Sequence, residues 1–73
     1  MQDKFQVWVT FSDGNYHLDK SWCSIEEVYS ALQRLLHGPI ALTGAIKEVR
    51  VVDSGDATVY LNQDGKQVWP ANG

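Results

Sequence analysis

The segment SIEEVYSALQRLLHGP, residues 24–39, contains the start, the apolar side and the end of one helix. Ser24 and Glu27 have the spacing of a capping box, in which each side chain accepts a hydrogen bond from the other residue's backbone N–H. Gly38 suits a left-handed cap and Pro39 cannot continue a helix, so we expect one helix of about 13 residues. Its apolar residues recur at helical spacing: Ile25, Val28, Tyr29, Leu32, Leu35 and Leu36.

The chain before this helix predicts a β-hairpin. Residues 4–11 alternate between apolar and polar side chains, as a half-buried strand does. Asp13-Gly14 follows, and both residues tolerate the positive φ of a two-residue hairpin loop. Such a loop places every apolar pair on one side of the sheet. The expected pairs are Phe11 with Tyr16, Val9 with Leu18 and Phe5 with Trp22, which leaves Trp8 on the other face, across from Asp19.

The chain after the helix starts with a connection and continues into a second hairpin. Residues 39–45 are apolar but contain proline and glycine, which predicts a covered connection rather than a strand. Residues 46–52 and 57–61 read as strands joined by a three-residue loop at 54–56. This loop length keeps the apolar residues on one face, pairing Val51 with Val59 and Val49 with Leu61.

A second Asp-Gly pair, Asp64-Gly65, predicts a two-residue turn into a last strand at 67–69, which Pro70 ends. It would pair Leu61 with Val68 and Tyr60 with Trp69. The sequence therefore predicts an α+β fold: an antiparallel five-stranded sheet in the order ββαβββ, with the helix packed on one face. The strand orders 2-1-3-4-5 and 2-1-5-4-3 both fit, and short connections favour the first.

Composition bounds the class of protein. With 73 residues, 44% of them apolar, we expect a single small domain over residues 1–73 with a marginal core. The net charge of -3 and scattered basic residues make a nucleic-acid backbone an unfavourable main partner. The single cysteine, Cys23, cannot form an internal disulfide, and the sequence contains neither a secretory leader nor an apolar membrane span. We expect a soluble cytoplasmic protein that does not bind membranes.

The two faces of the predicted sheet differ in character. The expected inner face, toward the helix, consists of Phe5, Val7, Val9, Phe11, Leu18, Val49, Val51, Val59, Leu61 and Val68. The expected outer face consists of Trp8, Thr10, His17, Ile46, Arg50, Val52, Thr58, Tyr60 and Trp69. Aromatic residues and arginine with few acids are typical of an interface rather than of a solvated sheet. The interface residues predicted from this pattern are Trp8, Arg50, Val52, Thr58, Tyr60 and Trp69.

These residues favour a non-enzymatic interaction module that forms a homodimer or docks on a protein partner. Two alternatives use the same face: a surface cluster of rings that only stabilises the sheet, and stacking of single-stranded bases with Arg50 and Lys47 on the phosphates. We expect no catalytic residues, because His17 and His37 have no neighbouring nucleophile, and Cys23 is expected to be a small buried hydrophobe.

We also expect no metal site and no cofactor, and the sequence identifies no small-molecule substrate. Asp53 and Asp56 could be imagined as a weak calcium site, but a hairpin turn needs the same residues. In its size, acidity and aromatic sheet the chain is similar to small accessory proteins of bacteria and their phages. This resemblance assigns no role to any residue.

Overall fold

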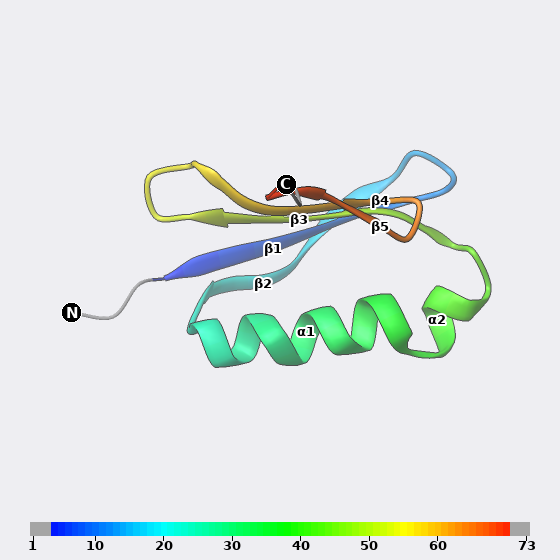
Figure 1. The fold of residues 1–73 in the computed structure, drawn as a ribbon, viewed down its shortest axis with the longest axis horizontal. Helices are drawn as coiled ribbons and strands as arrows, with labels where there is room; N and C mark the ends of the chain where they lie inside the picture. The colour runs from blue at the N-terminus through cyan, green and yellow to red at the C-terminus, as the bar shows by residue number, and fades with distance from the viewer. Residues whose placement is uncertain (1–3, 71–73) are drawn as a thin grey trace.

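The computed structural model describes residues 4–70, which form an α+β fold in the predicted order ββαβββ (Figure 1). Along the chain, a hairpin is followed by one helix, a short second helix and a three-stranded meander. The elements are β1 (Phe5–Phe11), β2 (Tyr16–Cys23), α1 (Ile25–His37), α2 (Pro39–Leu42), β3 (Ile46–Asp53), β4 (Thr58–Gln63) and β5 (Lys66–Trp69).

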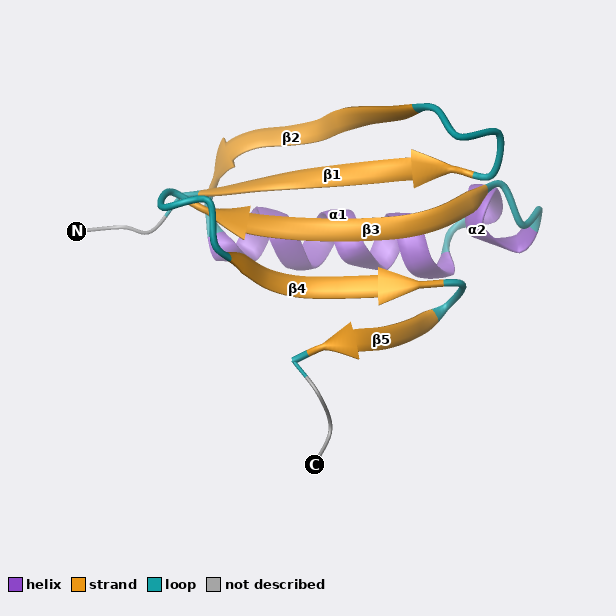
Figure 2. Ribbon diagram, turned by 90° about the horizontal axis from the view of Figure 1, so that it is seen from above, coloured by secondary structure: helices purple, strands orange, loops and turns teal. Residues whose placement is uncertain are grey.

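The five strands form one antiparallel sheet in the order β2-β1-β3-β4-β5, which confirms the favoured of the two predicted orders. Helix α1 packs against β1, β2 and β3. In Figure 2 it lies behind the middle of the sheet, and β4 and β5 extend beyond it. The helix therefore covers one face of the sheet only in part.

The capping box at the start of α1 is confirmed. Ser24 Oγ accepts from the Glu27 backbone N–H at 3.3 Å, and Glu27 Oε2 accepts from the Ser24 N–H at 3.2 Å. The predicted left-handed cap at Gly38 is wrong, because this glycine is extended, with φ -84° and ψ 179°. Glycine is needed for space instead: a Cβ here would lie 2.3 Å from the Arg34 carbonyl oxygen.

The core between α1 and the sheet is built mainly from valine. Four valines, two on β1 and two on β3, are almost completely buried, and three residues of α1 pack on them. Phe5 and Cys23, which pair at one end of β1 and β2, belong to the same buried cluster. The residues of the core are Phe5, Val7, Val9, Cys23, Val28, Ala31, Leu35, Val49 and Val51.

The connection at residues 39–45 is not a strand, as predicted, but it is not covered. Its first part forms α2, with Pro39 in the first turn, and the chain turns at Gly44 with φ +75°. Ile40 and Leu42 are exposed, Leu42 by 85%. No helix within residues 4–70 is long and apolar enough to cross a membrane.

The loop of the first hairpin has three residues, Ser12–Gly14, so the predicted two-residue loop is wrong. Phe11 N donates to Asn15 O at 2.7 Å, and within this loop only Gly14 has a positive φ. Two bonds favour the longer loop: Asp13 Oδ1 accepts from Asn15 N at 2.9 Å, and Ser12 N donates to Ala45 O at 2.7 Å.

The longer loop shifts the pairing of β1 and β2 by one residue, so each residue of the first part of β2 lies on the face opposite to the one expected. The observed pairs are Thr10 with Tyr16, Val9 with His17 and Trp8 with Leu18, so Leu18 is not a core residue. Two bulges then follow, and Phe5 pairs with Cys23. Asp19, the extra residue of the first bulge, forms an ion pair of 2.6 Å with Arg34 of α1.

The loops of the other two hairpins are confirmed. Asp53 N donates to Ala57 O across the three residues 54–56, and Gln63 pairs with Lys66 across Asp64-Gly65. Beyond each loop, however, a bulge shifts the predicted pairing by one residue. The observed pairs are Val51 with Tyr60, Arg50 with Leu61, Val49 with Asn62 and Leu61 with Trp69. Leu61 thus leaves the predicted core and Val68 is 45% exposed, whereas Val59 packs against the core as expected.

Candidate functional site: the outer face of the sheet

A row of paired residues crosses all five strands on the outer face, the side of the sheet away from α1. Paired residues of antiparallel strands point to the same side, so the row can be followed from strand to strand. It starts at Leu18 on the β2 edge and ends at Trp69 on the β5 edge. We call Leu18, Trp8, Arg50, Leu61 and Trp69 the transverse row.

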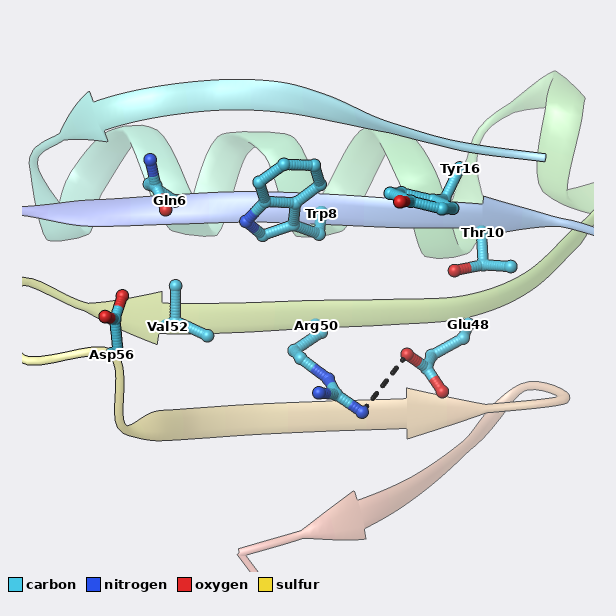
Figure 3. A pocket seen from close by; sticks show the side chains of 8 residues that line it. All are labelled: Gln6, Trp8, Thr10, Tyr16, Glu48, Arg50, Val52 and Asp56. Carbon is cyan, nitrogen blue, oxygen red and sulfur yellow. Dashed lines mark ion pairs between the residues drawn. The ribbon is translucent and has the colours of Figure 1, made fainter.

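Trp8 lies in a shallow hollow of about 420 Å³ in the middle of this face. Figure 3 shows its indole ring nearly face-on, so the ring lies flat across β1 and presents a broad apolar surface. The Tyr16 ring stands beside it, with the ring centres 6.1 Å apart and the planes inclined by 53°. The hollow is lined by Gln6, Trp8, Thr10, Tyr16, Glu48, Arg50, Val52 and Asp56.

Arg50 and Glu48 bring opposite charges to the same hollow. Both come from β3, two residues apart and therefore on one face, and Arg50 Nη2 lies 3.5 Å from Glu48 Oε2 (Figure 3). The Arg50 side chain keeps 45% of its surface exposed. Glu48 is less exposed, at 22%, and its Oε1 also accepts from Gln63 Nε2 at 2.9 Å, so Arg50 can turn to another partner more easily than Glu48 can.

Five of the six predicted interface residues lie on the outer face. Trp8, Arg50 and Val52 line the hollow, Thr58 pairs with Val52, and Trp69 ends the transverse row. The predicted placement of Tyr60 is wrong. A bulge at Val59 turns Tyr60 to the inner face, where it pairs with Val51 and packs against the core.

The structure also moves His17 and Ile46 from the predicted outer face. His17 pairs with Val9, and its ring lies 5.0 Å from that of Phe11. Ile46 packs against the core from the start of β3. Tyr16, Leu18 and Leu61 lie on the outer face instead, although Leu18 and Leu61 were predicted for the inner face and Tyr16 was predicted to pair with Phe11 there. The available signal for Tyr16 was Asp13, whose side chain accepts from the Asn15 N–H in the longer loop.

Cys23 and Asp53, the residues closest to a catalytic or metal-binding candidate, have structural roles. The Cys23 side chain is buried, and its thiol donates to the Phe5 carbonyl oxygen at 3.5 Å. Burial, followed by the negative charge of Glu27, raises the pKa of the Cys23 thiol, which opposes formation of a thiolate. Asp53 Oδ1 accepts from Gly55 N and Ala57 N, as a turn residue does. Among residues 4–70, no three His, Cys, Asp or Glu side chains form a group that could hold a metal ion.

The outer face therefore offers one flat indole, a second tryptophan at the β5 edge, an ion pair on β3 and the aliphatic residues Leu18, Val52 and Leu61. Comparison of the chain with protein-family models, with curated proteins and with solved structures finds no match.

Proposed function

We propose that this protein is a small, non-enzymatic, cytoplasmic interaction domain that forms a homodimer by packing the outer faces of two sheets together. The observation that carries the proposal is the transverse row, to which each of the five strands contributes one tryptophan, arginine or leucine. Tryptophan and arginine are enriched among the residues that dominate binding energy at protein interfaces.

The charges on this face suit a second copy of the same chain. In a two-fold interface, residue i of one copy contacts residue j of the other, and j contacts i. Because Glu48 and Arg50 are neighbours on β3, a two-fold axis between them brings each arginine to the partner's glutamate. The charges of Glu48 and Arg50 are then neutralised by those of the second copy.

The size of the chain supports the same proposal. A domain of this length buries only about 60% of the surface of its unfolded chain, so further burial contributes noticeably to its stability. A standard interface takes about 800 Å² from each partner. That is about one sixth of the 5056 Å² exposed by this chain.

Light scattering coupled to size exclusion tests the proposal. We expect the wild type to have twice the chain mass of 8.2 kDa at high micromolar concentration. Trp69→Ala should weaken dimerisation at least about tenfold, as the loss of an interface anchor does. The matched control is Tyr29→Ala, since Tyr29 is also an exposed aromatic residue, 63% against 51% for Trp69, and lies on α1, away from the outer face.

A charge exchange tests the two-fold contact itself. Arg50→Glu places glutamate against the partner's Glu48 and should give a monomer, whereas the double variant Glu48→Arg with Arg50→Glu should dimerise again. A wild type that stays at the mass of one chain contradicts the proposal. If that monomer's tryptophan fluorescence is quenched by a short oligothymidylate, base stacking on Trp8 becomes the favoured function, although Glu48 and Asp56 in the hollow repel phosphates.

A further inference from the structure

A second concave site lies on the other side of the sheet, where α1 stops short of β4. The space between α1 and the β3–β4 hairpin is a groove of about 470 Å³, within the range of small-molecule sites. Its walls include Leu32 from α1 and Val59 from β4. This groove shares no lining residue with the outer hollow, so what it binds is independent of the proposed dimer.

Three aromatic rings from three different elements line the groove: Phe5 of β1, Tyr29 of α1 and Tyr60 of β4. Phe5 is buried, whereas Tyr29 is 63% exposed. The Tyr60 hydroxyl accepts from Asn62 Nδ2 at 3.3 Å, which holds its ring along the inner face. The faces of aromatic rings carry negative potential and attract organic cations.

Asp53 gives the groove a negative charge. It pairs with Phe5 and therefore faces the same side, and it is the one charged residue among the described residues that line the groove. The two hydrogen bonds that the Asp53 carboxylate accepts within residues 4–70 both end on Oδ1, from Gly55 N and Ala57 N, so Oδ2 can accept from a ligand. The positive end of the α1 dipole lies near, but Glu26 and Glu27 in the first turn offset it.

We propose that this groove binds a small organic cation, an ammonium group carried on an apolar or aromatic body. The ammonium lies between the rings and donates to Asp53 Oδ2, while the body packs on Leu32 and Val59. A neutral apolar ligand would offer no donor to Asp53 Oδ2, and an anion would be repelled by the carboxylate.

The test compares phenethylammonium with 2-phenylethanol, which have the same carbon skeleton and differ in charge. Each is titrated to about 20 mM into the isotope-labelled protein, and amide shifts are followed by NMR. We expect phenethylammonium to shift residues 25–32 and 53–60 and to bind at least about fivefold more tightly than the alcohol, the factor that one partly exposed ion pair provides.

Two variants at the turn between β3 and β4 distinguish binding in the groove from a general attraction of the cation to an acidic protein. Asp53→Asn keeps the Oδ1 acceptor for the turn and removes the charge, so it should weaken phenethylammonium binding about fivefold. Asp56→Asn removes a charge on the outer hollow, at a left-handed residue where asparagine fits, and should change the affinity less than about twofold. Equal binding of amine and alcohol, equal effects of the two variants, or no shifts in the groove at all would each overturn the proposal.

Discussion

The two faces of this sheet are made by the same strands, yet they differ in what their residues do. On β3, Val51 is 1% exposed beneath α1, while its neighbours Arg50 and Val52 line the outer hollow. The inner positions are filled by β-branched valines, which have few rotamers to lose on burial. The outer positions carry aromatic, polar and aliphatic side chains, and these keep more of their surface in solvent than the inner valines do. Stability therefore depends mainly on the inner face, and recognition can use the outer face without unfolding the domain.

The largest effect should come from breaking the inner face. Leu35 of α1 is 4% exposed, so Leu35→Ala should lower the free energy of unfolding by about 2 to 5 kcal/mol through lost burial and a new cavity. Leu42→Ala makes the same change at an 85% exposed position of α2 and should cost less than about 0.5 kcal/mol. Urea unfolding at one fixed protein concentration measures both, since dimerisation makes stability depend on concentration. Similar losses in the two variants would mean that α1 does not carry the core.

The same valine-to-threonine substitution at two adjacent residues of β3 compares how much each face contributes to stability. Val51→Thr places a hydroxyl among apolar side chains and should cost about 1 to 3 kcal/mol. Val52→Thr makes the identical change on the outer face, next to Thr58, and should be almost neutral at a protein concentration low enough to keep the chain monomeric, because solvent then reaches the hydroxyl. Thermal unfolding of the two variants gives the comparison. If Val52→Thr were the more destabilising, the assignment of the two faces would be reversed.

Local signals in the sequence were enough for α1 and the five strands, but not for the short helix α2. The capping box at Ser24 and the loops at 54–56 and 64–65 depend on residues close together in the chain, and each was predicted. The strand order followed from short connections. The end of α1 was predicted at the right residue for the wrong reason, since Gly38 is required by the Arg34 carbonyl and not by a left-handed backbone.

The pairing of the strands depended on contacts that the local sequence does not contain. The first loop is held by the bond from Ser12 to Ala45, and the bulge at Asp19 accompanies an ion pair with Arg34. Because side chains alternate along a strand, each shift of one residue exchanges the two faces. Thus Tyr60 was assigned to the candidate site and Leu61 to the core, whereas the bulge at Val59 gives the reverse. The residues of β1 and β3 up to Val52 were placed correctly except Ile46, because they form the centre of the sheet.

The smallest effect concerns Cys23, at the end of the inner face, and appears only at alkaline pH. Burial and Glu27 raise the pKa of this thiol in the folded protein, so the unfolded chain loses the proton first as pH rises. The stabilisation from the neutral thiol is complete below the ordinary thiol pKa of about 8.5 and is lost as pH increases above it.

We therefore expect the stability difference between the wild type and Cys23→Ala to shrink from about pH 7 to about pH 10, as measured by urea unfolding. Taking the difference between two proteins removes the titration of lysine and tyrosine residues, which both chains share. Ser21→Ala, at an exposed position of β2, should show no such dependence on pH. A constant or growing difference for Cys23→Ala would mean that the thiol is no harder to ionise in the folded chain, and hence that the inner face is open to water at this end.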